Sequence, residues 1–420
     1  MASNREKKEK KRQPAGRVRP EQTAGGPAQP AEESQGLHAL PPKRKRRRGR
    51  SLLRLLLRLA LVAVLVLGIL LVYQNWDSIA PESLVIWLEE RLSGGQGGDG
   101  FPVEISGSEV LDMAETQDGL ALLTDTAYLV YNSNGGEVLR RPHGFSSPIM
   151  KTAVKWTLIA EAEGTRLRLE NRSSTQSEMT LEKRIIGAAV AKNGSFAVST
   201  ESSQGYTSEI AVYSSKEKLL YRWYGESLTV LDVALSADGQ YLAAVGVAAQ
   251  AGAMKSTLLI FDLGKESPVV QLDDTETMLF AVEFFENGTA AAVGDTGMWV
   301  ANPSGAIQQK VGYGDGELAG FAVGERNASF ALQGYGGTDG GELLVVNPSG
   351  DQAYTAAYEG TYRHMAPTDS GAVLLTSGHV YETGTQGVEK TLDAPRDGRL
   401  IGTLGHKVIV LGLTTLSEAG

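Results

Sequence analysis

The residues best suited to metal chemistry are histidines, and beyond the first hundred residues they are widely spaced: His143, His364, His379 and His406. None of them has the close spacing of a metal motif. Cysteine is absent, which excludes disulfides, thiolate nucleophiles and cysteine-ligated metals. No Gly-x-Ser-x-Gly elbow and no Gly-Lys-Ser/Thr phosphate loop occurs. We therefore expect a non-enzyme with no catalytic residues, no cofactor and no metal.

Two short clusters and one loop carry residue types that are enriched where proteins bind one another. The residues that we single out as candidate partner contacts are Arg140, Arg141, His143 and Phe145, then Trp223 and Tyr224, and lastly Tyr335 in the glycine-rich stretch 334–341. Each has a competing structural interpretation. The basic-aromatic segment could lock neighbouring elements together, strand alternation could bury Trp223, and the glycine-rich stretch could be a plain flexible loop.

The elements that must position these side chains are predicted to be short strands joined by tight corners. Four corners are Asp118-Gly119, Asn193-Gly194, Asp238-Gly239 and Asn287-Gly288, and looser ones follow at Asn327-Ala328 and Ser370-Gly371. Such dipeptides suit the positive φ angles of a type I′ turn, so each predicts a β-hairpin. Their recurrence over the chain predicts an all-β propeller whose repeats, of WD40-like length, are four-stranded blades.

A second kind of corner supports the repeat. Asn302-Pro303-Ser304-Gly305 and Asn347-Pro348-Ser349-Gly350 are nearly identical and lie 45 residues apart. Complete blades can be drawn from Gly107, Ile149, Ile185, Thr229, Met278, Ala319 and Tyr362. We favour eight blades over seven, because a corner at Gly405 keeps the period. Residues 101–105 could supply the fourth strand of the last blade and so close the ring.

The amino-terminal part has a different character. Residues 1–50 are polar and end in a run of Lys and Arg, which predicts a disordered basic tail. Residues 59–73 carry no charge, and the span 55–76 is about 33 Å long as a helix, matching a bilayer core of about 30 Å. We predict a transmembrane helix within 51–76. A cleaved signal peptide is the competing interpretation, but no Ala-x-Ala site is present.

Charge divides the chain in the same place. Residues 1–58 hold 17 Lys/Arg against 5 Asp/Glu, although the whole chain has a net charge of −9. The basic run should therefore stay in the cytoplasm, with the acidic remainder outside. Residues 77–100 are predicted to form an amphipathic helix and a glycine-rich linker, and residues 101–420 the propeller. An acidic domain is a poor nucleic-acid binder, so we expect none.

Several short motifs occur in a characteristic order: Pro81-Glu82 before Trp87, Phe101-Pro102-Val103, Asp125-Thr126, the segment from His143 to Pro148, and Tyr206-Thr207-Ser208 before Val212-Tyr213. In residues 59–420 the chain resembles an uncharacterised family of single-pass, membrane-anchored propeller proteins from Gram-positive bacteria. The resemblance implies a fold and a location in the bacterial cell membrane, with the amino terminus cytoplasmic. It implies no activity and no catalytic residues.

Our leading hypothesis is a membrane-anchored, extracytoplasmic binding or scaffold protein, held in the membrane by residues 55–76. Its partner would be an envelope protein or a cell-wall component, and the sequence indicates neither its identity nor the oligomeric state. The alternative is an enzyme with a small-molecule or metal site at the propeller channel, which rests on fold-level analogy. A sensor that signals to the cytoplasmic tail is a third hypothesis, which the flexible linker disfavours.

Overall fold

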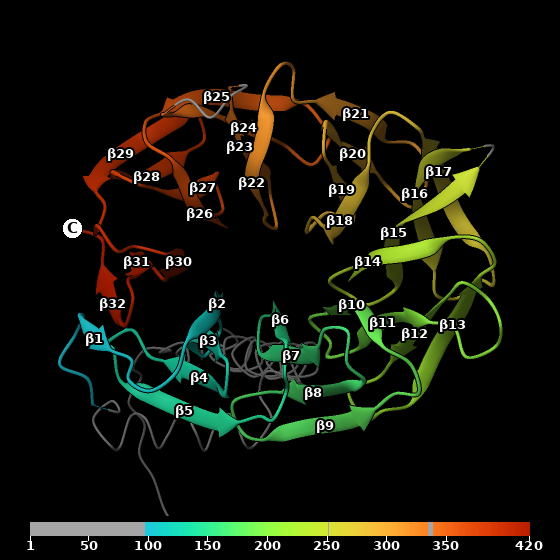
Figure 1. Ribbon diagram of the computed structural model, residues 1–420, viewed down its shortest axis with the longest axis horizontal. Coiled ribbons are helices and arrows are strands. Elements are labelled where there is room, and N and C mark those ends of the chain that lie inside the picture. The colour runs from blue at the N-terminus through green and yellow to red at the C-terminus, as the bar shows by residue number, and fades with distance from the viewer. Residues whose placement is uncertain (1–96, 251, 335–338) are drawn as a thin grey trace, which may run out of the picture. The chain divides into compact units, whose positions relative to one another are not determined.

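The computed structural model describes residues 97–250, 252–334 and 339–420, which form a ring of four-stranded sheets around a common axis (Figure 1). We call the axial space inside the ring the channel. The predicted tail and span, and nearly all of the predicted helix and linker before residue 101, lie outside the described residues. Among the described residues, no helix is long and apolar enough to cross a bilayer.

Every blade is an antiparallel meander. From the innermost strand outward, the first four blades are β2 (Val110–Thr116), β3 (Gly119–Thr124), β4 (Ala127–Tyr131) and β5 (Glu137–Pro142); β6 (Pro148–Ala153), β7 (Trp156–Glu161), β8 (Arg166–Glu170) and β9 (Thr175–Thr180); β10 (Ile185–Val190), β11 (Phe196–Glu201), β12 (Ser208–Tyr213) and β13 (Leu219–Gly225); and β14 (Thr229–Leu235), β15 (Tyr241–Gln250), β16 (Ala253–Asp262) and β17 (Pro268–Asp274).

Blades five to seven continue the same pattern, and blade eight takes its outer strand from the start of the domain. They are β18 (Leu279–Phe284), β19 (Ala290–Gly294), β20 (Gly297–Ala301) and β21 (Gln308–Gly312); β22 (Glu317–Val323), β23 (Ala328–Gln333), β24 (Gly341–Val346) and β25 (Gln352–Tyr358); β26 (Tyr362–Pro367), β27 (Ala372–Thr376), β28 (His379–Gly384) and β29 (Gly387–Asp393); and β30 (Leu400–Leu404), β31 (Lys407–Leu411), β32 (Thr415–Glu418) and β1 (Val103–Glu104).

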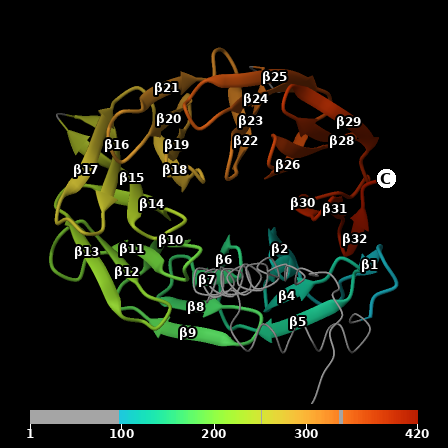
Figure 2. The same cartoon turned by 180° about the vertical axis from the view of Figure 1, so that it is seen from behind.

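The ring is closed by pairing between the two ends of the domain. Val103 of β1 lies opposite Leu416 of β32, and Glu104 lies opposite Thr415. Figure 2 shows β1 beside β32 from behind. The prediction of eight blades is confirmed, and so is the prediction that residues 101–105 complete the last blade.

Burial follows the position of a strand within its blade. The second and third strands are almost wholly buried, as in β19 and β20, whereas the outermost strand β21 is almost wholly exposed. Each middle strand is covered on both faces by the neighbouring blades, which explains its unbroken apolar sequence. The core is accordingly divided among the seams: one cluster joins blades three and four, for example, and another joins blades eight and one.

The predicted hairpins are present, but the Asn-Gly corners are not two-residue type I′ turns. At Asn193-Gly194 the amide of Gly194 donates to the carbonyl of Ala191, and Ala191 donates to Ser195, which closes a three-residue loop. Gly194 has a φ of 83°, whereas Asn193 is not among the described residues with positive φ. Asn193 serves through its side chain instead, because its Oδ1 accepts the N–H of Ser195 at 2.8 Å.

The ring has two distinct sides. On the hairpin side, the first strand of each blade turns back into the second. On the connection side, the outermost strand of one blade leads to the innermost strand of the next, so β2, β6, β10 and their counterparts all begin there (Figure 1).

Candidate functional site

Charged side chains from distant blades meet in the channel. Lys151 of β6 and Glu283 of β18 form an ion pair, with 2.8 Å between Nζ and Oε1, although they are 132 residues apart. Glu283, with smaller contributions from Asp232 and Asp112, raises the pKa of Lys151, although partial desolvation acts in the opposite direction. Lys151 therefore remains a protonated ammonium at neutral pH.

Asp232 of β14 lies beside this pair. Its Oδ2 accepts the N–H of Val282 at 3.0 Å. Burial raises the pKa of Asp232 to about 6, with Glu283 acting in the same direction and Lys151 against it. Its carboxylate is thus charged at neutral pH at a cost in free energy.

Asp112 of β2 and His364 of β26 extend the group toward blades one and seven. Burial raises the pKa of Asp112, whose Oδ1 accepts the N–H of Met113 at 2.7 Å. Burial lowers the pKa of His364, with Asp112 acting in the opposite direction. Asp112, Lys151, Asp232, Glu283 and His364 form what we call the channel cluster. It holds three carboxylates against one ammonium, so it is negative at neutral pH.

The channel opens on the hairpin side into a depression of about 720 Å³, which we call the basin. Every one of the eight blades contributes to its wall. Representative lining residues, one from each blade, are Glu115, Thr152, Lys192, Ala237, Glu283, Glu325, Asp369 and Thr403. Because these side chains sit on strands or tight hairpins, the basin is preorganised.

The wall of the basin is predominantly acidic. Its carboxylates are Glu115, Glu283, Glu286, Glu325 and Asp369, and Lys192 is the ammonium among its lining residues. Lys192 is itself paired with Glu325. Arg326 lies 3.6 Å from Glu286 at the rim. The electrostatic field of the basin therefore favours cations.

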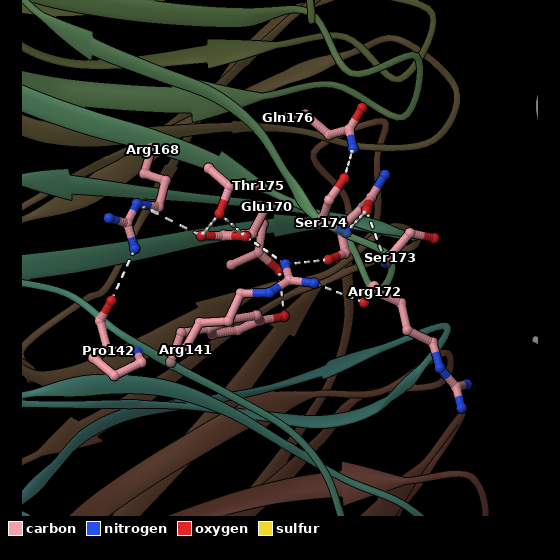
Figure 3. Close-up of polar contacts among 12 residues, drawn as sticks. Arg141, Pro142, Arg168, Glu170, Arg172, Ser173, Ser174, Thr175 and Gln176 are labelled. Carbon is pink, nitrogen blue, oxygen red and sulfur yellow. Dashed lines mark hydrogen bonds and ion pairs between the residues drawn. The ribbon is translucent and has the colours of Figure 1, made fainter. Parts of the chain in front are cut away.

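The predicted contact residues of the 140–145 segment lie at the seam between blades one and two. Arg141 reaches into blade two, where Nη1 lies 2.5 Å from Oε2 of Glu170 and also donates to the carbonyl of Asn171 at 2.6 Å (Figure 3). The Glu170 side chain is fully buried, with Arg168 at 3.7 Å as a further cation. Arg140 instead pairs on the surface with Glu137 of its own strand. Arg141 thus holds two blades together.

His143 and Phe145 occupy the same seam. The Nε2 of His143 is 3.0 Å from the carbonyl of Thr124, and the N–H of Phe145 donates to Nδ1 at 3.3 Å. Phe145 is buried, and the guanidinium of Arg166 lies over its ring at 5.0 Å. The structure therefore gives these residues a part in joining the blades, and their binding of a partner stays a prediction.

The second predicted cluster lies on a different seam. Trp223 packs on Phe261 of blade four with 5.3 Å between ring centroids, as alternation along β13 suggested. Tyr224 stacks on Tyr206 at 5.0 Å, and Tyr206 is exposed. Beside them, Arg222 and Glu209 line a smaller cleft of about 270 Å³. The two clusters are not brought together, and Tyr335 lies outside the described residues.

Sequence reasoning missed the channel cluster altogether. Each of its members lies on the innermost strand of its blade, in an otherwise apolar or small-residue context such as the β14 sequence TVLDVAL. A charge in such a strand was the available signal. In the described part of the chain, no three His, Asp or Glu side chains are grouped closely enough to hold a metal ion.

Residues 103–394 match the model of a family of unknown function, DUF5711. The chain belongs to this family. The match runs from β1 to just beyond β29, and so covers the closing strand and the first seven blades. None of the curated proteins matches the sequence.

Among solved structures, the C-terminal WD40 domain of Sif2 supports the propeller architecture. That domain is 12% identical with a TM-score of 0.54, over 77% of this chain and 99% of its own length. BamB from Moraxella catarrhalis is 10% identical with a TM-score of 0.47, over 76% and 100%. Hydrazine synthase from Kuenenia stuttgartiensis is 12% identical with a TM-score of 0.42, over 58% and 78%. At such identities the likeness concerns the propeller fold alone.

Proposed function

We propose that this chain is a membrane-anchored binding protein that presents its propeller outside the bacterial cell to an envelope protein or a cell-wall component. The apolar span 55–76, with the basic run before it, supports the anchor and the orientation. The propeller supports a binding role, because its loops and hairpins are held on a closed and rigid ring.

The observation that carries this proposal is the convergence of all eight blades on one basin. Small-molecule sites are mostly apolar with a few polar groups. The basin is instead lined by many charged and hydroxyl side chains, including Glu325, Asp369 and Thr403. A surface of this kind suits a segment of a larger partner, which can satisfy several polar groups at once.

The charge of the basin indicates the charge of the partner. Carboxylates outnumber ammonium groups among the lining residues. A partner segment rich in lysine or arginine would gain from the long-range field as it approaches and from direct pairing once bound. We therefore propose a basic partner segment at the basin.

The channel cluster is the feature that an enzyme hypothesis would use, and its chemistry favours binding instead. Lys151 is paired with Glu283 and its pKa is raised, so it is protonated and cannot act as a nucleophile or base at neutral pH. The basin that adjoins the cluster at Glu283 is predominantly polar, unlike most small-molecule sites. We propose no reaction for this site.

Photo-crosslinking of the full-length chain in its own membrane tests the proposal. A photoreactive residue replaces Thr368 in the basin wall, and a matched control replaces Gln176 on the exposed outer strand β9. We expect a reproducible envelope partner from position 368 and none from position 176. Equal capture at both positions, or no capture at position 368, would overturn the binding role of the basin.

The orientation needs its own measurement. Protease added to intact cells should digest exposed hairpins of the propeller, whereas an epitope placed before residue 40 should survive. The reverse pattern would overturn the extracytoplasmic location while leaving the crosslinking result valid.

A further inference from the structure

Six of the innermost strands carry a β-bulge near their start, on the connection side of the ring. In each of them the ladder skips one residue. A bulged residue is left out of the pairing, and its strand bends there. The skipped residues, which we call the collar, are Leu111, Ile186, Leu231, Phe280, Ala319 and Arg363.

The collar is apolar and accessible. Leu111 is 41% exposed and Phe280 is 37% exposed, although each lies on an innermost strand flanked by blades on both sides. Both therefore keep exposed surface at the inner edge of their blades. Phe280 makes an edge contact with Phe321 of the next blade at 5.8 Å, which fixes its ring.

Arg363 is the charged member of the collar. Its Nη1 donates to the carbonyls of Arg396 at 3.0 Å and Gly398 at 2.8 Å, so its guanidinium is held by the turn before β30. The other five members of the collar are apolar, in contrast to the acidic basin on the hairpin side.

Two carboxylates follow the collar directly. Asp112 comes after Leu111, and Asp232 comes after Leu231, so each lies one residue, or roughly 3.3 Å, further along its strand. Among the described residues, neither carboxylate has a lysine or arginine nitrogen within 4.0 Å. The positive charge of Lys151 interacts electrostatically with both carboxyl groups, but the Lys151 ammonium is hydrogen-bonded to Glu283. Two partly buried carboxyl groups thus lie directly beside the largely apolar collar.

We propose that the connection-side mouth of the channel binds a lysine or arginine side chain of a partner protein, with the collar around its aliphatic stem and Asp112 and Asp232 at its cationic head. Long cationic side chains combine these two properties, because their methylene groups pack on apolar surface while the charge reaches a polar region. This second site lies opposite the basin and does not depend on it.

The combination of features selects this occupant over simpler ones. A purely apolar side chain would fill the collar and leave the two carboxylates uncompensated. An acidic side chain would be repelled by the cluster, which is negative at neutral pH. A free metal ion would gain nothing from the apolar collar.

Binding of defined peptides to the full-length protein in detergent micelles tests this inference. The probes are fluorescent capped heptapeptides of small neutral residues, with lysine, norleucine or glutamate at the centre, read by anisotropy. We expect the lysine peptide to bind at least tenfold more tightly than the norleucine peptide, and the glutamate peptide not to bind. Equal affinity for lysine and norleucine, or no binding of lysine, would overturn the proposal.

Variants then locate the site. Asp112→Asn combined with Asp232→Asn should abolish the higher affinity for the lysine peptide over the norleucine peptide. Phe280→Ser should weaken the binding of both peptides. Asp351→Asn, on an exposed outer turn, is the matched control and should change nothing. Loss of lysine binding in Glu325→Gln alone would place the peptide in the basin and overturn the collar site.

Two further outcomes are informative. If light scattering shows a dimer that Phe280→Ser dissociates, the occupant of the collar is a second copy of this chain and the proposal is wrong. If the collar variants have no effect while crosslinking from the basin persists, this inference fails and the proposed function stands.

Discussion

The Nζ of Lys151 and the Oε1 of Glu283 meet at 2.8 Å and link blade two directly to blade five. Most contacts in a propeller join neighbouring blades, so this ion pair is a brace across the ring. Both side chains are partly exposed to the channel, at 33% and 41%. Solvent screening therefore limits what the pair contributes.

We expect a double-mutant cycle with Lys151→Met and Glu283→Gln to give a coupling free energy of about 1 kcal/mol, as for other partly exposed pairs. Urea unfolding of the four variants measures it. Arg184 and Glu163, a pair at 2.9 Å whose side chains are 54% and 69% exposed, provide the control and should couple more weakly. A coupling near zero for Lys151 and Glu283 would mean that the brace has no energetic role.

The raised pKa of Asp232 predicts a pH dependence of stability. The folded protein binds this proton more tightly than the unfolded chain, because the pKa rises from 3.8 to about 6. The free energy of unfolding due to this group is therefore highest below about pH 4 and falls as the pH rises through 6.

Asp232→Asn removes that loss, so the variant should gain stability relative to the wild type between pH 4 and pH 8, by at most about 3 kcal/mol. Thermal unfolding at several pH values measures the difference. Asp351, on an exposed outer turn, offers a control substitution whose effect should be flat with pH. A flat difference for Asp232→Asn as well would show that the Asp232 carboxylate is not desolvated.

The seam between blades one and two predicts unequal costs for two adjacent arginines. Arg141→Ala leaves the buried Glu170 carboxylate with Arg168 as its nearest cation at 3.7 Å, and should cost about 3 kcal/mol. Arg140→Ala removes an exposed pair with Glu137 and should cost less than about 1 kcal/mol. Chemical denaturation compares the two, and similar costs would contradict a locking role for Arg141.

Two glycines have nearly the same backbone conformation, so alanine substitution at each distinguishes the cost of backbone strain from the cost of steric crowding. Gly194 has a φ of 83° and Gly205 a φ of 84°. A Cβ at Gly194 would lie 2.6 Å from the Trp156 ring, whereas a Cβ at Gly205 meets nothing within 4 Å. Gly205→Ala should cost about 1 kcal/mol from backbone strain. Gly194→Ala should cost a further 1–3 kcal/mol or so from overpacking, measurable as a lower Tm.

The architecture could be predicted from the sequence because turn residues act locally. The two Asn-Pro-Ser-Gly corners adopt matching turns, with Gly305 donating to Asn302 and Gly350 to Asn347. Turns of this kind fix the strand boundaries, and their recurrence fixes the number of blades. The predicted turn type at Asn193-Gly194 was wrong, because the choice between a two- and a three-residue loop depends on strand register.

The channel cluster could not be predicted for a related reason. Which side chain of an innermost strand faces the axis depends on the bulges, and these shift the register by one residue. Nor could the sequence show that Arg141 would be satisfied by Glu170, because the two are 29 residues apart and meet only when blades pack. The basic and aromatic composition of residues 140–145 is compatible both with a partner contact and with a contact between neighbouring blades.

Closure of the ring by β1 has a mechanical consequence. Two residue pairs, Val103 with Leu416 and Glu104 with Thr415, join this strand to its neighbour, and the N–H of Ile105 donates to the carbonyl of Thr414 just beyond them. Tension on the polypeptide ahead of residue 97 would load the hydrogen bond from Gly100 to the carbonyl of Asn134 and then those pairs. Blade eight is therefore where the ring would first open under force. The strength of the short β1–β32 pairing sets the force that the domain withstands when it is pulled from its amino-terminal end.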